Sequence, residues 1–290
     1  MGKSYTSDME QRADLHIHTT ASDGTLTPEQ VVEAASGIGL AAIAITDHDT
    51  VSGIAPALEA GRRFGVEVVP GIEISAMRHG RTEAHILGYC IDHECSELVK
   101  FVGKLVDARR ERAERMVEQL NAAGVPIEFE RVVEIARGGA LGRPHVAKAI
   151  CEVSAASSMD SAFGRFLQHG CPGHVPRYKV EPAEAVRLII RAGGVPCCAH
   201  VAKLKRDDLV SSLIEEGLAA VEVWHPDHSA AASRFYERFA RARGLIATGG
   251  SDAHCFDNGK PSAVGQITVP YEVVERLRRA ARDLRPHQLP

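Results

Sequence analysis

Histidine and carboxylate side chains recur along this chain at the ends of short apolar runs. The first group contains Asp14, His16 and His18, and the last contains Asp252 and His254. Imidazole and carboxylate groups together are the ligands that proteins use for divalent ions such as Mn²⁺, Zn²⁺ and Fe²⁺. If one fold brings these groups to the same place, the sequence predicts a hydrolytic centre with several metal ions.

The apolar runs that must position these groups alternate with helical patterns. We expect strands at 13–17, 40–46, 66–72, 84–91, 195–199, 220–224 and 245–248, and helices at 27–36, 54–64, 182–191, 207–216 and 230–243. Most of these strands are apolar on both faces, as in a parallel sheet that helices cover. The pattern predicts an α/β fold, namely a seven-stranded (β/α)7 TIM-like barrel.

The alternation stops between residues 93 and 180. This segment predicts a long charged helix at 97–121 and shorter helices at 129–136, 144–153 and 159–167. Because its flanks belong to one β/α series, we expect a small helical domain inserted into a barrel of residues 13–92 and 181–290, with an N-terminal tail at 1–12. The insertion is expected to cover the active site, and its charged stretch Arg109 to Glu118 to be a solvated helix face.

The candidate ligands fall where such a barrel has its active site, at the C-terminal ends of the strands. A single histidine there is more often an ordinary hydrogen-bonded residue, but independent placement at successive strand ends is improbable. In strand order the candidates are His16 and His18 with Asp23 in the following loop, then Asp47, His48 and Asp49, then Glu73, His85, His200, His225, and finally Asp252 and His254.

Composition restricts the location and the partners. The 290 residues are 44% hydrophobic, which allows one sizeable domain. A net charge of −4 argues against broad nonspecific nucleic-acid binding. The seven cysteines lack the spacing of a zinc ribbon or a secreted disulfide framework, and no apolar run approaches the roughly 20 residues of a membrane span. We expect a cytoplasmic protein without a membrane partner or an obligate protein partner.

Six segments, taken in this order, resemble the motifs of the polymerase and histidinol phosphatase (PHP) superfamily: DLHIHTTASDG (14–24), ITDHDT (45–50), GIEIS (71–75), His85, the AH pair at 199–200 and GSDAH (250–254). The resemblance covers essentially the whole chain. It implies a distorted barrel with three divalent metal ions, most often Mn²⁺. The implied ligands are His16, His18, Glu73 and Asp252 for one ion, Asp23, His48 and His254 for a second, and Glu73, His85 and His200 for a third, with Glu73 bridging.

Such a cluster favours hydrolysis of a phosphoester. Adjacent divalent ions generate a hydroxide at neutral pH and stabilise the attacking and leaving oxygens at phosphorus. We therefore expect a metal-bound hydroxide as nucleophile and no covalent intermediate. His225 is either the general acid for the leaving group or a structural or substrate-positioning residue. Asp14, Asp47 and Asp49 either orient the imidazoles or serve as turn and cap residues.

Two basic clusters at the ends of the insertion predict a second phosphate pocket. Gly142-Arg143-Pro144-His145 opens a helix with proline at its first position, which directs free N–H groups toward an anion. The second cluster is Pro176-Arg177-Tyr178-Lys179. Arginine suits bidentate phosphate binding, whereas lysine acts as a point charge. The predicted phosphate-binding residues are Arg143, Arg177 and Lys179, with His145 and Lys148 as weaker candidates.

A metal site and a separate cationic site together imply a small substrate with two phosphates. The insertion and its basic clusters resemble the PHP branch that hydrolyses nucleoside 3′,5′-bisphosphates, such as adenosine 3′,5′-bisphosphate to AMP and phosphate. That branch is also similar to 5′–3′ exoribonucleases acting on short RNA. The alternatives are a histidinol phosphate phosphatase, which would not use Arg143 and Arg177 together, a polymerase proofreading module, and a non-catalytic metal-stabilised nucleotide-binding module.

Overall fold

The computed structural model describes residues 11–79, 82–254 and 264–284. Its strands form one sheet in the order β7-β6-β5-β4-β3-β2-β1-β8. The sheet is nearly closed, since the segment after β7 bonds to β1: the Ala253 carbonyl accepts the His18 N–H at 3.0 Å. The strands are β1 (Arg12–Ile17), β2 (Ala42–Ile45), β3 (Glu67–Arg78), β4 (Thr82–Tyr89), β5 (Val195–Cys198), β6 (Ala220–Trp224), β7 (Ile246–Gly249) and β8 (Val269–Pro270). The predicted α/β barrel is therefore confirmed.

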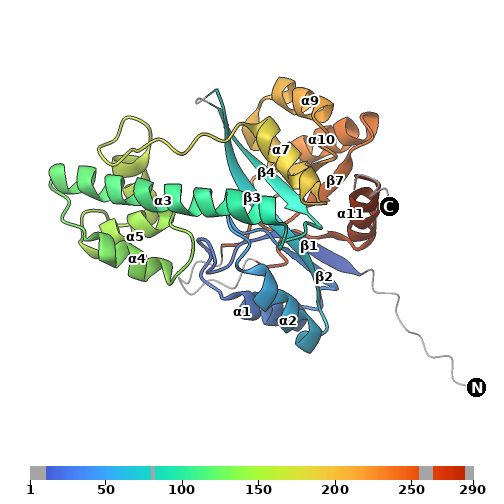
Figure 1. The fold of residues 1–290 in the computed structure, drawn as a ribbon, viewed down its shortest axis with the longest axis horizontal. Coiled ribbons are helices and arrows are strands. Elements are labelled where there is room, and N and C mark those ends of the chain that lie inside the picture. The colour runs from blue at the N-terminus through green and yellow to red at the C-terminus, as the bar shows by residue number, and fades with distance from the viewer. Residues whose placement is uncertain (1–10, 80–81, 255–263, 285–290) are drawn as a thin grey trace, which may run out of the picture.

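Helices pack around this sheet and bury its apolar strands (Figure 1). All four residues of β2 are buried, and Ile43 and Ile45 join one hydrophobic core with residues of the surrounding helices. The strand ends are thereby held in fixed positions. The helices of this part are α1 (Pro28–Gly37), α2 (Ile54–Phe64), α7 (Pro182–Arg191), α8 (Val201–Leu204), α9 (Asp207–Glu215), α10 (Ala230–Ala242) and α11 (Glu272–Leu284).

Helix α1 begins close to the predicted position, with Thr27 as the residue that caps it. The Thr27 hydroxyl accepts the Gln30 N–H, the Gln30 side chain accepts the Thr27 N–H, and Pro28 occupies the first turn. These contacts satisfy N–H groups that a helix start otherwise leaves without partners. The helix therefore begins where the loop that carries Asp23 ends.

Strand number and strand direction differ from the prediction. The described residues contain eight strands rather than seven, and β4 runs antiparallel to both β3 and β5. Arg78 at the end of β3 pairs with Thr82 at the start of β4. So short a connection leaves no room for a crossover helix, and direct connections join antiparallel strands. The reversal places His85, near the start of β4, opposite Ser75 of β3.

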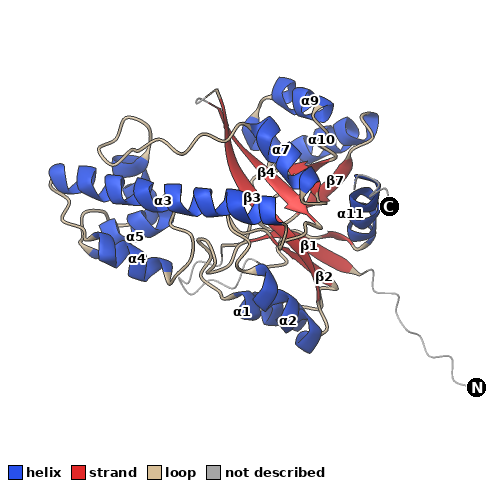
Figure 2. Ribbon diagram, in the orientation of Figure 1, coloured by secondary structure: helices blue, strands red, loops and turns tan. Residues whose placement is uncertain are grey.

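The helical segment 93–180 extends away from the barrel and has its own hydrophobic core (Figure 2). Its loop at 137–142 returns to the barrel, where the Ala140 N–H donates to the Ala21 carbonyl at 2.8 Å. The long helix α3 packs its first half on the barrel core and its second half in the core of the segment. The helices are α3 (Ser96–Ala122), α4 (Phe129–Ala136), α5 (Arg143–Glu152) and α6 (Met159–Ala162), followed by the π-helix η1 (Phe163–Leu167).

The two ends of the barrel also differ from the prediction. We did not predict β8 and α11, although Val274 and Leu277 of α11 are buried against the sheet. The expected tail at 1–12 is too long, because β1 begins at Arg12 and pairs with β8. Residues 1–10 of that tail lie outside the described residues. Among the helices that the structure describes, none is both long and apolar enough to cross a membrane.

Candidate metal centre and phosphate pocket

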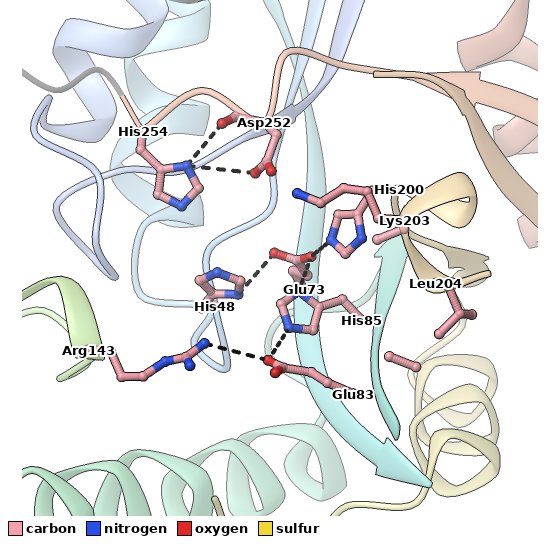
Figure 3. A pocket seen from close by; sticks show the side chains of 12 residues that line it. His48, Glu73, Glu83, His85, Arg143, His200, Lys203, Leu204, Asp252 and His254 are labelled. Atoms are coloured by element: carbon pink, nitrogen blue, oxygen red, sulfur yellow. Dashed lines mark hydrogen bonds and ion pairs between the residues drawn. The ribbon is translucent and has the colours of Figure 1, made fainter. Parts of the chain in front are cut away.

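The nine predicted ligands come together at one end of the barrel. Six of them line a cavity of ≈ 350 Å³ (Figure 3). Eight of the nine fall into three overlapping groups whose ligand atoms lie within 4.8 Å of one another, and His200 lies beside the third group. The groups are His18, Asp23, His48 and His254; His16, His18 and Asp252; and His48, Glu73 and His85.

Glu73 lies at the centre of this cluster. It is 1% exposed, and its two carboxylate oxygens face five imidazoles, as the predicted bridging role requires. Divalent ions with ligand bonds of ~2.1 Å keep neighbouring ligand atoms roughly 3 to 3.5 Å apart. The distances from Glu73 are close to this range: 3.4, 3.3 and 2.9 Å from Oε2 to His16 Nε2, His18 Nε2 and His48 Nδ1, and 2.8 and 3.3 Å from Oε1 to His85 Nδ1 and His200 Nε2.

The other two carboxylates lie on either side of the imidazole of His18. Asp252 Oδ1 is 3.1 Å from His18 Nε2 and 3.4 Å from His16 Nε2. Asp23 Oδ1 is 3.3 Å from His254 Nε2 and 3.9 Å from His18 Nδ1. The donor set therefore has the composition and spacing of a divalent metal site with more than one position.

Buried atoms without hydrogen-bond partners test whether this donor set fits metal ions. Buried polar atoms are almost always paired in proteins. In the part of the chain that the structure describes, nine buried side-chain atoms make no hydrogen bond of acceptable geometry, and six of these belong to the predicted ligands, which approach one another only as close N···O pairs: His16 Nε2, both ring nitrogens of His18, Asp23 Oδ1, His48 Nδ1 and Glu73 Oε2. Divalent cations would satisfy these atoms, so the residues fit the implied group.

The ionisation of the cluster supports the same conclusion. Burial alone would raise the pKa of Glu73, but the imidazoles of His48 and His85 hold it well below its usual range. Burial would lower the pKa of His18, yet Asp252 and Glu73 raise it to about 10. Burial lowers the pKa of His48 to about 4, although Glu73 opposes this. A protonated imidazole such as that of His18 thus balances carboxylate charge, and metal binding must displace its proton.

A buried carboxylate that we did not predict, Glu222, holds two of the ligands. Its Oε1 is 2.9 Å from His16 Nδ1, and its Oε2 accepts the His200 backbone N–H at 2.6 Å. A partner on Nδ1 fixes the ring and directs the lone pair of Nε2 into the cluster. The sequence contained a sign of this role, because Glu222 is a charged residue within the otherwise apolar strand Ala220-Val221-Glu222-Val223.

The three predicted supporting aspartates hold the backbone of the ligand-bearing loops. Asp14 accepts the Ser251 N–H at 2.9 Å, and Asp47 accepts the Thr19 N–H at 2.7 Å. Asp49 has a φ of 54° and accepts the Ser75 N–H at 2.8 Å. The hydrogen bonds of these carboxylates fix the loops rather than the imidazole rings.

Arg109 is not part of a solvated helix face, in contrast to our prediction. Its side chain is 12% exposed, and its guanidinium donates to Asp49 at 2.7 Å, to Ser75 at 3.2 Å and to the Leu141 carbonyl at 3.2 Å. This arginine of α3 therefore ties the helical segment to the loop that follows His48.

We expect Arg109→Lys to lower the free energy of unfolding by about 1–3 kcal/mol, because an ammonium group cannot hold three acceptors spaced for a guanidinium fork. Urea unfolding followed by circular dichroism measures the change. Arg115→Lys, at an exposed position of the same helix, is the matched control. Equal stabilities of the two variants would contradict this role.

His225 is buried beside Asp252 and does not line the cavity. Its Nε2 is 3.1 Å from Asp252 Oδ2, and its Nδ1 accepts the Asp227 N–H at 3.0 Å. The proton therefore resides on Nε2, directed at Asp252. This geometry suits a residue that positions Asp252, and a role as general acid stays a prediction.

The predicted phosphate-binding residues are only partly brought to the cavity. Arg143 lines it, and Arg177 contacts Glu83, which also lines it. His145 is buried, and its Nδ1 accepts the Gly142 N–H at 3.0 Å. Lys148 and Lys179 are exposed and do not line the cavity, whereas Lys203, which we did not predict, does.

A nearly closed barrel with a buried histidine and carboxylate cluster at its rim defines a metal-dependent hydrolase. Comparison with known proteins gives the particular family, since a family model for the PHP domain matches residues 14–138. The chain belongs to the PHP family, as its motifs indicated, and it is a phosphoesterase.

Three relatives align with most of the chain. A phosphoribosyl 1,2-cyclic phosphate 1,2-diphosphodiesterase of Eggerthella lenta is 36% identical over 83% of this chain and 93% of its own length. The 5′-3′ exoribonuclease Rnm of Escherichia coli is 37% identical over 83% and 84%. A 3′,5′-nucleoside bisphosphate phosphatase of Chromobacterium violaceum is 32% identical over 85% and 88%.

A solved structure supports the same fold. It is a chain from Bifidobacterium adolescentis assigned as a metal-dependent phosphoesterase, with a TM-score of 0.86 and 30% identity over 93% of this chain and 96% of that one.

Proposed function

We propose that this phosphoesterase removes the 3′-phosphate of nucleoside 3′,5′-bisphosphates, and that it also degrades short 5′-phosphorylated oligoribonucleotides from the 5′ end. The observation that carries the proposal is the cavity. The cluster of the nine predicted ligands, called the metal-type cluster below, and the guanidinium of Arg143 face this one space. The 3′,5′-nucleoside bisphosphate phosphatase and the 5′-3′ exoribonuclease among the relatives support the two activities.

In this proposal the cluster holds three divalent ions, with Mn²⁺ as the expected metal. His16, His18, Glu73 and Asp252 hold one ion, Asp23, His48 and His254 a second, and Glu73, His85 and His200 a third. Divalent ions held there would supply Lewis acidity toward a phosphoryl oxygen and a nucleophile from water at neutral pH. The chain's own part is to fix these donors, with Glu222 orienting the ring of His16 and Asp14 and Asp47 holding the loops.

The cations of the cavity give the preference for a second phosphate. Arg143 is 29% and Arg177 16% exposed, so both guanidiniums lie where water screens them little. Arginine forks match phosphate oxygens in pairs. A 5′-phosphate held there would fix the distance from the ribose to the cluster and present the 3′-phosphate for hydrolysis. A histidinol phosphate substrate has no second phosphate for these guanidiniums to bind.

We expect Arg177→Ala to lower kcat/KM for adenosine 3′,5′-bisphosphate by about 10- to 100-fold, because hydrogen bonds to charged groups contribute about 1.5–3 kcal/mol. The loss on an aryl phosphate should be much smaller, since that substrate has no second phosphate. Steady-state kinetics of the Mn²⁺-loaded protein on both substrates measures the difference. Equal losses would remove the argument for a second phosphate pocket.

The diphosphodiesterase relative provides a second candidate, hydrolysis of a cyclic phosphate on a phosphorylated ribose. This reaction would use the metal-type cluster for the cyclic phosphate and the guanidiniums of Arg143 and Arg177 for the other phosphate. Release of phosphate from adenosine 3′,5′-bisphosphate and from phosphoribosyl 1,2-cyclic phosphate, and release of 5′-mononucleotides from a 5′-phosphorylated trinucleotide RNA, compared as kcat/KM, rank the three substrates. A cytoplasmic location remains part of the proposal, supported by the free thiols of Cys95, Cys151, Cys171, Cys197 and Cys198.

A further inference from the structure

A glutamate of β4 lies between the two functional parts of the cavity. Glu83 Oε1 is 2.7 Å from Arg177 Nη2 and 4.0 Å from Arg143 Nη2. The same oxygen is 3.1 Å from His85 Nε2 at the edge of the metal-type cluster. Figure 3 shows the carboxylate directed toward Arg143 and His85. One anionic oxygen thus occupies the place where the two guanidiniums converge.

The surrounding charge exceeds what this carboxylate can neutralise. Arg112 lies nearby and donates to the Val175 carbonyl at 2.8 Å. Burial, together with repulsion from Arg177 and Arg143, lowers the pKa of Arg112 to about 9. Arg177 Nη1 is buried and has no hydrogen-bond partner. A buried donor of this kind requires an acceptor, so the pocket can receive more negative charge and more acceptor atoms than Glu83 supplies.

We propose that Glu83 is an intramolecular occupant of the second phosphate pocket, which a substrate phosphate displaces and which re-enters when the product leaves. The inference rests on the proposed function of Arg143 and Arg177. A phosphate carries about −1.5 to −2 charges and three acceptor oxygens, so it replaces the single carboxylate and also pairs Arg177 Nη1. The exchange weakens the hold on the 5′-phosphate and thereby limits inhibition by the 5′-monophosphate product.

Glu83→Gln in the full Mn²⁺-loaded chain tests this inference, because it removes the charge and keeps the size of the side chain. We expect KM for adenosine 3′,5′-bisphosphate to fall about tenfold, equivalent to about 1.4 kcal/mol. The calorimetric Kd of AMP should fall by a similar factor. Adenosine 3′-monophosphate has no 5′-phosphate, and its KM should stay near that of the wild type.

Glu118→Gln, which removes an exposed charge from α3, is the matched control and should leave all three constants unchanged. Three results would overturn the inference. A higher KM for the bisphosphate would mean that Glu83 helps to bind substrate. Equal changes for adenosine 3′-monophosphate would indicate only a general charge effect. Lower kcat on every substrate with loss of bound metal would mean that Glu83 merely orients His85. If the wild type does not hydrolyse the bisphosphate, the proposed function fails, while AMP calorimetry still tests Glu83.

Discussion

Glu73→Gln is expected to lower kcat for every phosphoester substrate by about 10³-fold, the factor that corresponds to about 4 kcal/mol of activation free energy. Both oxygens of Glu73 face imidazoles, so an amide would turn its NH₂ group toward at least one of them. An amide nitrogen is not a metal ligand, and it would also leave the cluster with one negative charge fewer. The variant should therefore hold less metal as well as react more slowly.

Metal content by atomic emission and steady-state kinetics on an aryl phosphate measure the two effects of this change together. Glu59→Gln, at an exposed position of α2, removes the same charge far from the cluster and should behave as the wild type. A Glu73→Gln protein that keeps its full metal content and turnover would show that the cluster does not work as described.

The ligand-bearing loops could be predicted because each motif is local. His16 and His18 directly flank the end of β1, and Asp252 and His254 follow β7 within a few residues. Apolar strands then determine where these residues converge, since the barrel brings the strand ends to one rim. The pattern of buried strands and the chemistry of the loop residues therefore gave the fold class and the set of side chains at the site.

Contacts between distant segments could not be predicted in the same way. Arg109 lies in a charged helical run whose periodicity does not distinguish a solvated arginine from one that binds Asp49, 60 residues earlier in the chain. The contact of Glu83 could not be predicted either. Its partner Arg177 lies far along the chain, and only folding brings the two side chains together. The antiparallel direction of β4 was missed because we expected the preceding strand to end at residue 72, whereas β3 continues to Arg78 and leaves too short a connection for a parallel crossover.

Hydrogen bonds between distant parts of the chain link the metal-type cluster to the helical segment 93–180. Arg109 joins α3 to Asp49, and Asp49 in turn holds the Ser75 N–H of β3, two residues beyond Glu73. The loop at 137–142, which leads into Arg143, bonds to the loop between His18 and Asp23 through Ala140 and Ala21. The helical segment therefore helps to set the geometry of the metal-type cluster and also carries Arg143 and Arg177 of the proposed phosphate pocket.

Glu222→Gln is expected to reduce metal affinity by about 10- to 100-fold, the usual cost of losing a partner that orients a ligand. The amide oxygen can still accept from His16 Nδ1, but the amide nitrogen cannot accept the His200 N–H that Glu222 now binds at 2.6 Å. His200 has a φ of 29°, a backbone conformation that its neighbours must hold in place. Loss of this bond should therefore release His200 and weaken the proposed metal position that it shares with Glu73 and His85.

Isothermal titration calorimetry of the metal-free variant with Mn²⁺ measures the loss of metal affinity without relying on turnover. Activity at saturating Mn²⁺ should recover more in Glu222→Gln than in Glu73→Gln, because the first variant keeps every predicted ligand. Glu216→Gln is the matched control: Glu216 lies beyond the end of α9 and pairs with Arg187 on the surface. Unchanged Mn²⁺ affinity in a folded Glu222→Gln protein would show that His16 and His200 are held by the barrel backbone alone, and the buried carboxylate would then need another explanation.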